Sequence, residues 1–147
     1  GMSFSLTQLE KGVSGVAWSP DGEQLAFSMF VKAKKPSFAT PLSPPKDANW
    51  NEPFNVIDDF TFRFDGAGYL QDGASQIFTL PVNGGTPRQV TFEEAGLSNP
   101  QWLDNNKLLV TGNLAEDRDL DPIESEIYKL DLSNLNLTAL TLALIHI

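Results

Sequence analysis

The chain has 147 residues, of which 41% are hydrophobic and none is cysteine, and its formal net charge is −9. This length and composition are typical of a globular protein with one ordinary domain. The lack of cysteine excludes disulfides, thiolate metal sites and a cysteine nucleophile. Because nucleic acids and anionic membrane surfaces attract clustered Lys and Arg, the acidic charge predicts neither as a partner.

The N-terminal residues have neither the basic start nor the apolar run of a secretory signal, and Gly1 before Met2 is typical of a scar from tag removal. The simplest expectation is a cytoplasmic protein. The most apolar stretch, 137–147, is interrupted by polar residues and is shorter than the roughly 20 residues that cross a bilayer. The sequence therefore predicts no membrane span.

Residues 1–12 are expected to hold the tag scar and a lead-in strand. The following run, 13–18, is rich in β-branched and aromatic side chains, as is 25–28, and both predict strands. Between them, Pro20 presets φ, Asp21 tolerates the bridge region and Gly22 takes a positive φ. This turn chemistry predicts an antiparallel hairpin.

A segment of roughly residues 31–72 separates this hairpin from the next strands. Its aromatic residues lie outside any repeated pattern, and such residues either cover a neighbouring surface or line a substrate passage. Cover is the more common role, and a passage or an interface is the functional alternative. The candidates for that alternative are Trp50, Phe54, Phe62 and Tyr69.

The next strands again form a hairpin in the sequence pattern. Residues 77–82 are apolar and β-rich, Gly84 and Gly85 supply turn chemistry, and 87–91 completes the pair. Residues 13–91 therefore predict four antiparallel strands with a long insertion between the second and the third.

The same order of elements returns further along the chain. Trp102 lies 84 residues after Trp18, and in both copies a leucine, Leu25 or Leu109, lies seven residues after the tryptophan. The aromatic residues at repeated positions are expected to pack in the core, and they are Trp18, Phe27, Phe78, Trp102 and Tyr128.

The second half of the unit repeats as well. Ile77 and Ile127 each precede a threonine by 14 residues. The tryptophan and the isoleucine are 59 residues apart in the first copy and 25 in the second, so the first copy holds about 34 additional residues.

Repeated four-stranded units are typical of β-propeller blades. We therefore expect an all-β fold, a partial β-propeller of about two four-stranded antiparallel blades over 13–92 and 93–141, followed by a truncated or aberrant tail at 142–147. The residues that define the repeat are Trp18, Pro20, Asp21, Gly22, Gly84, Gly85 and Trp102.

The run 16–22, with 25–28, resembles the propeller repeat shared by TolB-like proteins and prolyl oligopeptidases. The runs 56–70, 76–78, 84–91 and 112–128 resemble the acylaminoacyl-peptidase and dipeptidyl-aminopeptidase-like branch of the latter superfamily. The resemblance covers roughly residues 13–132. The second turn, 103–106, departs from it because Pro and Gly are missing there.

Proteins of this branch are serine peptidases whose α/β-hydrolase domain carries its nucleophile on a Gly-x-Ser-x-Gly elbow. No such elbow occurs here: Ser14 and Ser75 lack the flanking glycine pair, and His146 is the lone histidine. The resemblance therefore implies a noncatalytic propeller that gates or positions short peptides for a hydrolase domain of the parent protein, which is absent from this chain.

Two alternatives belong to other functional classes. A TolB-like propeller acts as a protein-interaction module without any hydrolase. A short chain of blades also self-associates through its exposed strand edges, since unpaired edges recruit partners.

Neither a metal nor a cofactor is expected. The acidic residues of 117–126 lack the spacing of an EF-hand and are typical of a solvated loop. The pair Gly66 and Gly68 is not followed by the third glycine of a phosphate-binding loop.

Overall fold

The structure is a computed structural model that describes residues 5–9, 11–33, 46, 63–64, 68–69, 72–118, 120 and 124–141. Every regular element in this part of the chain is a β-strand. The strands are β1 (Val13–Trp18), β2 (Gln24–Lys32), β3 (Arg63–Phe64), β4 (Gly68–Tyr69), β5 (Gly73–Pro81), β6 (Arg88–Gln89), β7 (Ser98–Asp104), β8 (Lys107–Gly112), β9 (Glu126–Asp131) and β10 (Asn136–Ala139).

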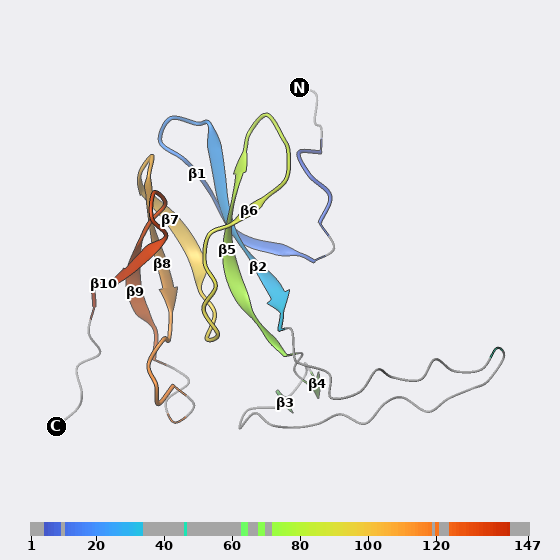
Figure 1. Cartoon of the computed structure of the whole chain (residues 1–147), viewed down its shortest axis with the longest axis vertical. Coiled ribbons are helices and arrows are strands. Elements are labelled where there is room, and N and C mark those ends of the chain that lie inside the picture. Colours follow the sequence, from blue (N-terminus) through green and yellow to red (C-terminus); the bar gives the residue numbers. More distant parts are fainter. Residues whose placement is uncertain are drawn as a thin grey trace.

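Eight of the strands form two four-stranded antiparallel sheets, and β3 and β4 form a separate antiparallel pair, which confirms the all-β prediction. We call the sheet β1-β2-β5-β6 the first unit and the sheet β7-β8-β9-β10 the second unit. The two units lie side by side, with β7 next to the first unit (Figure 1). The described strands do not close into a ring.

The turn between β1 and β2 is fixed by hydrogen bonds within it. Gly22 has a φ of 73° and donates its N–H to the carbonyl of Ser19 at 2.9 Å. The N–H of Ser19 reaches the carbonyl of Gln24 at 2.8 Å, which brings β2 back alongside β1. A positive φ is costly for most residues other than glycine, so Gly22 suits this position.

The insertion leaves the first unit between β2 and β5. These strands pair without interruption from Gln24 opposite Pro81 to Lys32 opposite Gly73, so β2 includes the first two residues of the expected insertion, 31 and 32. At the end of the pairing, Gly73 has a φ of 144°, and a Cβ there would lie 2.3 Å from the carbonyl oxygen of Val31. Only glycine fits at this junction.

The two units repeat at the level of single hydrogen bonds. The N–H of Ile77 is bonded to Oγ1 of Thr91 at 2.9 Å, and in the second unit the N–H of Ile127 is bonded to Oγ1 of Thr141 at 2.9 Å. The residue before each threonine donates its N–H to the same isoleucine, at 2.8 Å in both units. The outermost strand of each unit is therefore attached in the same way.

The equivalence of Leu25 and Leu109 suggested by their equal spacing from tryptophan is wrong. Trp18 pairs with Leu25, whereas Trp102 pairs with Leu108. The second turn is one residue shorter because Asp104 pairs directly with Lys107. A shift of one residue along a strand moves a side chain to the opposite face of the sheet. The structural counterpart of Leu25 is therefore Leu108, which pairs with Trp102 as Leu25 pairs with Trp18.

The main core lies between the two units. The first unit contributes Ala26, Ile77 and Val90, and all three are at most 1% exposed. The second unit contributes side chains from β8 and β9 and the residue before β7: Leu97, Leu108, Val110, Tyr128 and Leu130. The packing of the two sheets against each other therefore buries one face of each.

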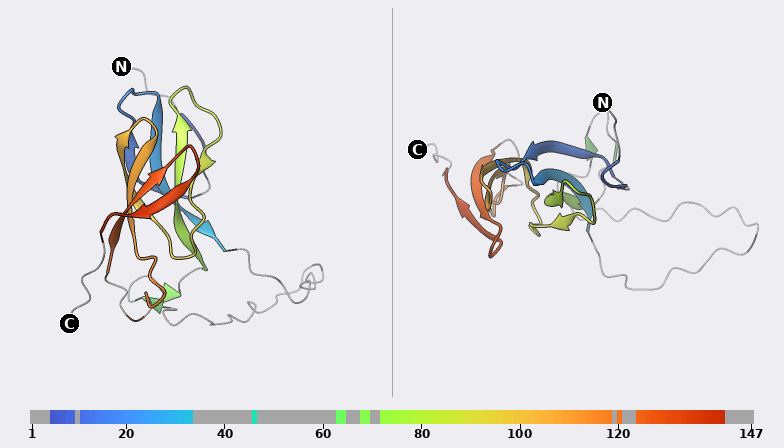
Figure 2. Two further views of the ribbon diagram at one scale, coloured as in Figure 1. Left: turned by 60° about the vertical axis from the view of Figure 1, so that its left-hand side comes forward. Right: turned by 90° about the horizontal axis from the view of Figure 1, so that it is seen from above.

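A smaller core lies on the other face of the first unit. Phe27 and Phe78 stack there, with ring centroids 5.8 Å apart and planes 9° apart. Leu6 and Leu9 pack against this cluster (Figure 2 shows their segment beside the first unit). The described residues before β1 form no strand, so the expected lead-in strand is here an irregular segment.

The matched threonines give a test of the repeat. Thr91→Val leaves the buried N–H of Ile77 without its acceptor, and we expect a loss of about 1–3 kcal/mol in the free energy of unfolding. Thr141→Val is the control, because Thr141 is exposed and water replaces its oxygen, so its effect should stay within roughly 0.5 kcal/mol. Urea unfolding measures the free energy of unfolding of both variants. Equal losses would contradict the expectation that the burial of Thr91 makes its hydrogen bond more important than that of Thr141.

Three turns are built by aspartates that accept the N–H two residues ahead. Asp21, Asp104 and Asp131 make these bonds at 3.0, 2.8 and 2.9 Å. The pKa of each is lowered: for Asp21 and Asp131 chiefly because a serine hydroxyl donates to the carboxylate, and for Asp104 chiefly because of the N–H of Asn106. The charged form is therefore favoured by the fold.

These lowered pKa values predict how stability depends on pH. Since the folded pKa lies below the unfolded value of about 3.9, the contribution is complete above that value and is lost as the pH falls through the folded pKa. Replacing Asp21, Asp104 and Asp131 by Asn keeps an acceptor oxygen and removes the titration. Melting curves should show a smaller drop in Tm from pH 6 to pH 3 in the triple variant than in the parent. An identical drop would locate the acid sensitivity elsewhere.

Candidate interaction surface

The two repeated tryptophans have different surroundings. Trp102 packs against the core between the units, and its Nε1 donates to the carbonyl oxygen of Ala17 in the first unit at 3.1 Å. Trp18 is 61% exposed, which corrects the expectation that it lies in the core. The two tryptophans lie on corresponding faces of their sheets, and in the described structure a four-stranded sheet packs against that face only for Trp102.

Val16 is exposed for the same reason. It occupies in β1 the position that Pro100 occupies in β7, and Pro100 is buried against the first unit whereas Val16 is 55% exposed. Leu6 and Leu9 cover the neighbouring Phe27 and leave the inner strand open. We call Val16 and Trp18 the leading patch.

The far face of the second unit also carries exposed apolar residues. Ile127 is 39% exposed, whereas its counterpart Ile77 is 0% exposed. Leu140 is 52% exposed, whereas its counterpart Val90 is 1% exposed. With the half-buried Leu109, these side chains share one face of the sheet. We call Leu109, Ile127 and Leu140 the trailing face.

The inner strands and turns of the two units approach closely. Gly15 and Asn99, at equivalent positions, both have a left-handed backbone with φ of 61° and 51°. A Cβ on Gly15 would lie 3.1 Å from Cδ of Pro100. The N–H of Asp21 donates to Oδ1 of Asn105 at 3.2 Å. Both contacts join the hairpin of β1 and β2 in the first unit to the hairpin of β7 and β8 in the second unit.

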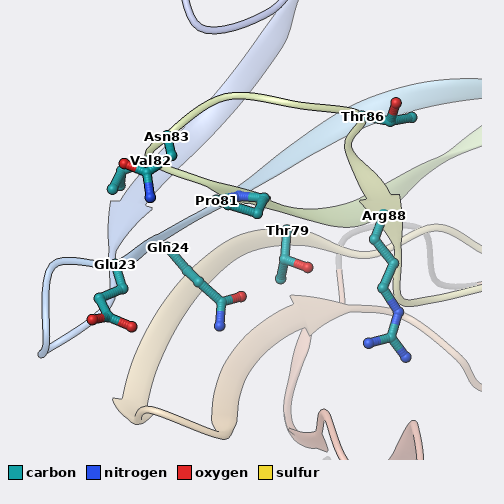
Figure 3. A pocket seen from close by; sticks show the side chains of 8 residues that line it. All are labelled: Glu23, Gln24, Thr79, Pro81, Val82, Asn83, Thr86 and Arg88. Atoms are coloured by element: carbon teal, nitrogen blue, oxygen red, sulfur yellow. The ribbon is translucent and has the colours of Figure 1, made fainter.

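A polar groove of about 690 Å³ lies on the first unit. No local sequence motif marks this groove, because its residues come from the residue before β2, from β2, β5 and β6, and from the turn between β5 and β6. Figure 3 shows its lining: Glu23, Gln24, Thr79, Pro81, Val82, Asn83, Thr86 and Arg88. The amide of Gln24, the hydroxyl of Thr79 and the guanidinium of Arg88 extend to the same side. The groove can hydrogen-bond a peptide backbone and pair with one carboxylate.

The repeat-defining turn residues lie at the ends of the sheets. Pro20, Asp21 and Gly22 connect β1 to β2 on the exposed surface. Gly84 and Gly85 connect β5 to β6 with φ of 85° and 130°, and the N–H of Gly84 reaches the carbonyl of Pro81 at 3.0 Å. Their geometry shapes turns and brings no reactive side chain into the groove.

The insertion candidates are not brought together in the described structure. Trp50, Phe54 and Phe62 lie outside the described residues, and Tyr69 lies in β4 opposite Arg63. Their proposed role in a passage or interface stays a prediction.

The hydroxyl groups with hydrogen bonds in the described part are engaged in structure. Ser14 Oγ and Ser28 Oγ lie 2.9 Å apart, and Ser28 also donates to the carbonyl of Ser14 at 3.0 Å. His146 lies outside the described residues. Within those residues there is no group of three or more His, Cys, Asp or Glu able to hold a metal. No described helix is long and apolar enough to cross a membrane.

A comparison with known protein families finds no matching family. Among curated proteins, the chain is 28% identical over 120 residues to the uncharacterized peptidase YuxL of Bacillus subtilis (strain 168). The match covers 81% of this chain and 18% of that protein. The chain thus spans less than a fifth of the length of this curated relative.

Solved structures of the AtxE2 isopeptidase are also similar. The apo structure matches with a TM-score of 0.49 at 15% identity, over 86% of this chain and 18% of that one. A variant with Astexin3-dC4 bound matches with a TM-score of 0.47 at 16% identity. Over most of its length, this chain is therefore similar in sequence to a small part of a protein named as a peptidase.

Proposed function

We propose that this chain is a noncatalytic portion of the β-propeller of a serine peptidase, and that it gates or positions short peptides for a hydrolase domain outside the chain. The observation that carries the proposal is the match to a peptidase-named protein over 81% of this chain but only 18% of that protein. A peptidase of that length has ample room for a separate catalytic domain.

The arrangement of the two units supports the propeller part of the proposal. Each unit is a four-stranded antiparallel meander, apart from the insertion, and the innermost strands β1 and β7 contact each other. Blades of a propeller stack face to face in this way around an axis. The exposed leading patch and trailing face fit the two ends of an incomplete stack.

The polar groove of the first unit supports a role in handling peptides. Gln24 and Thr79 offer hydrogen-bonding groups for an extended backbone, and Arg88 offers a cation for a carboxylate. In the described part of the chain, no nucleophile with a neighbouring histidine lines this groove. Its chemistry suits binding and selection of a peptide, with bond cleavage taking place elsewhere.

A second candidate function is a TolB-like module that binds other proteins and has no hydrolase partner. The exposed apolar residues at both ends of the stack favour it, since such surfaces mark interaction sites. This candidate needs no catalytic domain in the longer protein.

Hydrolysis of acyl-peptide and aminoacyl chromogenic substrates separates the two candidates. We expect the isolated chain to leave these substrates intact and the full-length gene product to cleave them. The difference should reach at least about 10³-fold in kcat/KM, because acyl transfer needs a placed nucleophile and base.

Cleavage by the isolated chain, at a rate that copurifies with it through two chromatographic steps, would refute a noncatalytic role. An inactive full-length protein that retains specific binding of another protein would favour the interaction module. Arg88→Gln in the active full-length protein should raise KM for substrates with a free carboxylate more than for their amides.

A further inference from the structure

We propose that Asn83 is a site of spontaneous deamidation, a reaction that turns its side-chain amide into a carboxylate in the lining of the polar groove. The modification itself goes beyond the proposed function and does not depend on it. Only its effect on a bound peptide rests on that function. Asn83 is the only asparagine of the chain that is followed by glycine, and it lines the groove together with Arg88.

The order of Asn83 and Gly84 in the chain suits this reaction for a steric reason. The backbone nitrogen of Gly84, after losing its proton, forms a bond to Cγ of Asn83, and the bond from Cγ to Nδ2 breaks to release ammonia. Water then opens the resulting cyclic imide at either carbonyl, which leaves aspartate or isoaspartate. A side chain on the second residue would crowd the attacking nitrogen, and glycine has none.

The side chain of Asn83 is free to move toward this nitrogen. It is exposed, and in the described part of the chain its amide makes no hydrogen bond. Other asparagines in turns are held in place. Oδ1 of Asn105 accepts the N–H of Asp21 at 3.2 Å. Oδ1 of Asn134 accepts the N–H of Asn136 at 2.9 Å.

One hydrogen bond restrains the attacking nitrogen. The N–H of Gly84 donates to the carbonyl of Pro81 at 3.0 Å, and this bond must open before the nitrogen can turn toward Asn83. Its net contribution to stability is small, so it should slow the reaction by roughly tenfold at most. The pairing of β5 with β6 lies further along, at Thr79 and Arg88, so opening the turn leaves the sheet intact.

Another exposed turn shows how the fold can prevent related chemistry. Asp21 is also followed by a glycine, Gly22, which has a φ of 73°. Imide formation from aspartate needs a protonated carboxyl group. The carboxylate of Asp21 accepts the hydroxyl of Ser19 and the N–H of Glu23, and these bonds lower its pKa. Asp21 is therefore held in its charged form, and we expect no isomerisation there while Asn83 reacts.

The new carboxylate changes the charge of the groove. The lining contains one acid, Glu23, and one cation, Arg88 (Figure 3). After deamidation of Asn83, two acids share that cation. A ligand carboxylate that pairs with Arg88 is then repelled. Because all three groups are exposed, the loss of affinity should be roughly two- to fivefold.

Peptide mapping by mass spectrometry tests the modification. The folded chain is incubated at pH 6 and at pH 9, and the mass increase that accompanies loss of the amide is localised after digestion. We expect Asn83 to react before every other asparagine, and faster at pH 9 because the nitrogen of Gly84 must lose its proton. The rate should lie within about tenfold of that of a synthetic peptide with the sequence of 79–88.

Asn83→Gln is the matched control. Glutamine keeps the amide, but its longer side chain would have to close a larger and less favourable ring, so this variant should show no mass increase at this position. A rate in the folded parent further below that of the peptide would show that the turn protects Asn83 and would overturn the proposal. Earlier reaction at another asparagine would also overturn it, as would aspartate without isoaspartate, because an imide yields both.

Binding of acetyl-dialanine, as the free acid and as the amide, tests the effect on the groove. Calorimetric titrations compare the parent with Asn83→Asp. The free acid should bind the variant roughly two- to fivefold more weakly, and the amide should bind both equally. Equal affinities for the free acid would refute the charge effect. A parent that binds neither peptide would refute the proposed role of the groove, while the mapping result at Asn83 would stand.

Discussion

The packing of the second unit onto one face of the first is the interaction on which the rest of the structure depends. A four-stranded sheet has two faces, and a single sheet of this size with apolar residues on both cannot keep both from water. Here Ala26 and Ile77 are fully buried in one cluster with Leu108 and Leu130 of the second unit. The stability of each unit is therefore tied to the presence of its neighbour.

This dependence explains why the two ends of the stack differ. At the first end, Leu6 and Leu9 shield Phe27 and Phe78 from solvent, so part of that face is closed by the chain itself. Trp18 lies beyond the reach of these two leucines and stays exposed. At the second end, the described residues include no segment that covers Ile127. Exposed apolar side chains at the two ends thus follow from the repeat itself.

The strands and turns were predictable because they depend on the local conformational preferences of the residues. The contacts between the two units were not predictable from the sequence. The turn at Pro20 and Gly22 has residues with strong φ preferences, and strand composition identified the rest of each hairpin. The register after Trp102 escaped prediction because it depends on the direct pairing of Asp104 with Lys107. The exposure of Trp18 escaped because a repeated position indicates which face a side chain occupies and not whether a partner covers it.

The polar groove could not be found from the sequence because its residues are separated by up to 65 positions and meet only through strand pairing. Once the strand register is known, the residues of the groove can be compared with those at equivalent positions in the second unit. Gln24 and Thr79 correspond to Lys107 and Lys129 in the second unit. In contrast, the core residues Ala26, Ile77 and Val90 correspond to apolar residues, which are Leu109, Ile127 and Leu140. The positions that join the two units thus stay apolar, whereas polar positions at this end of the sheets differ in charge between the units.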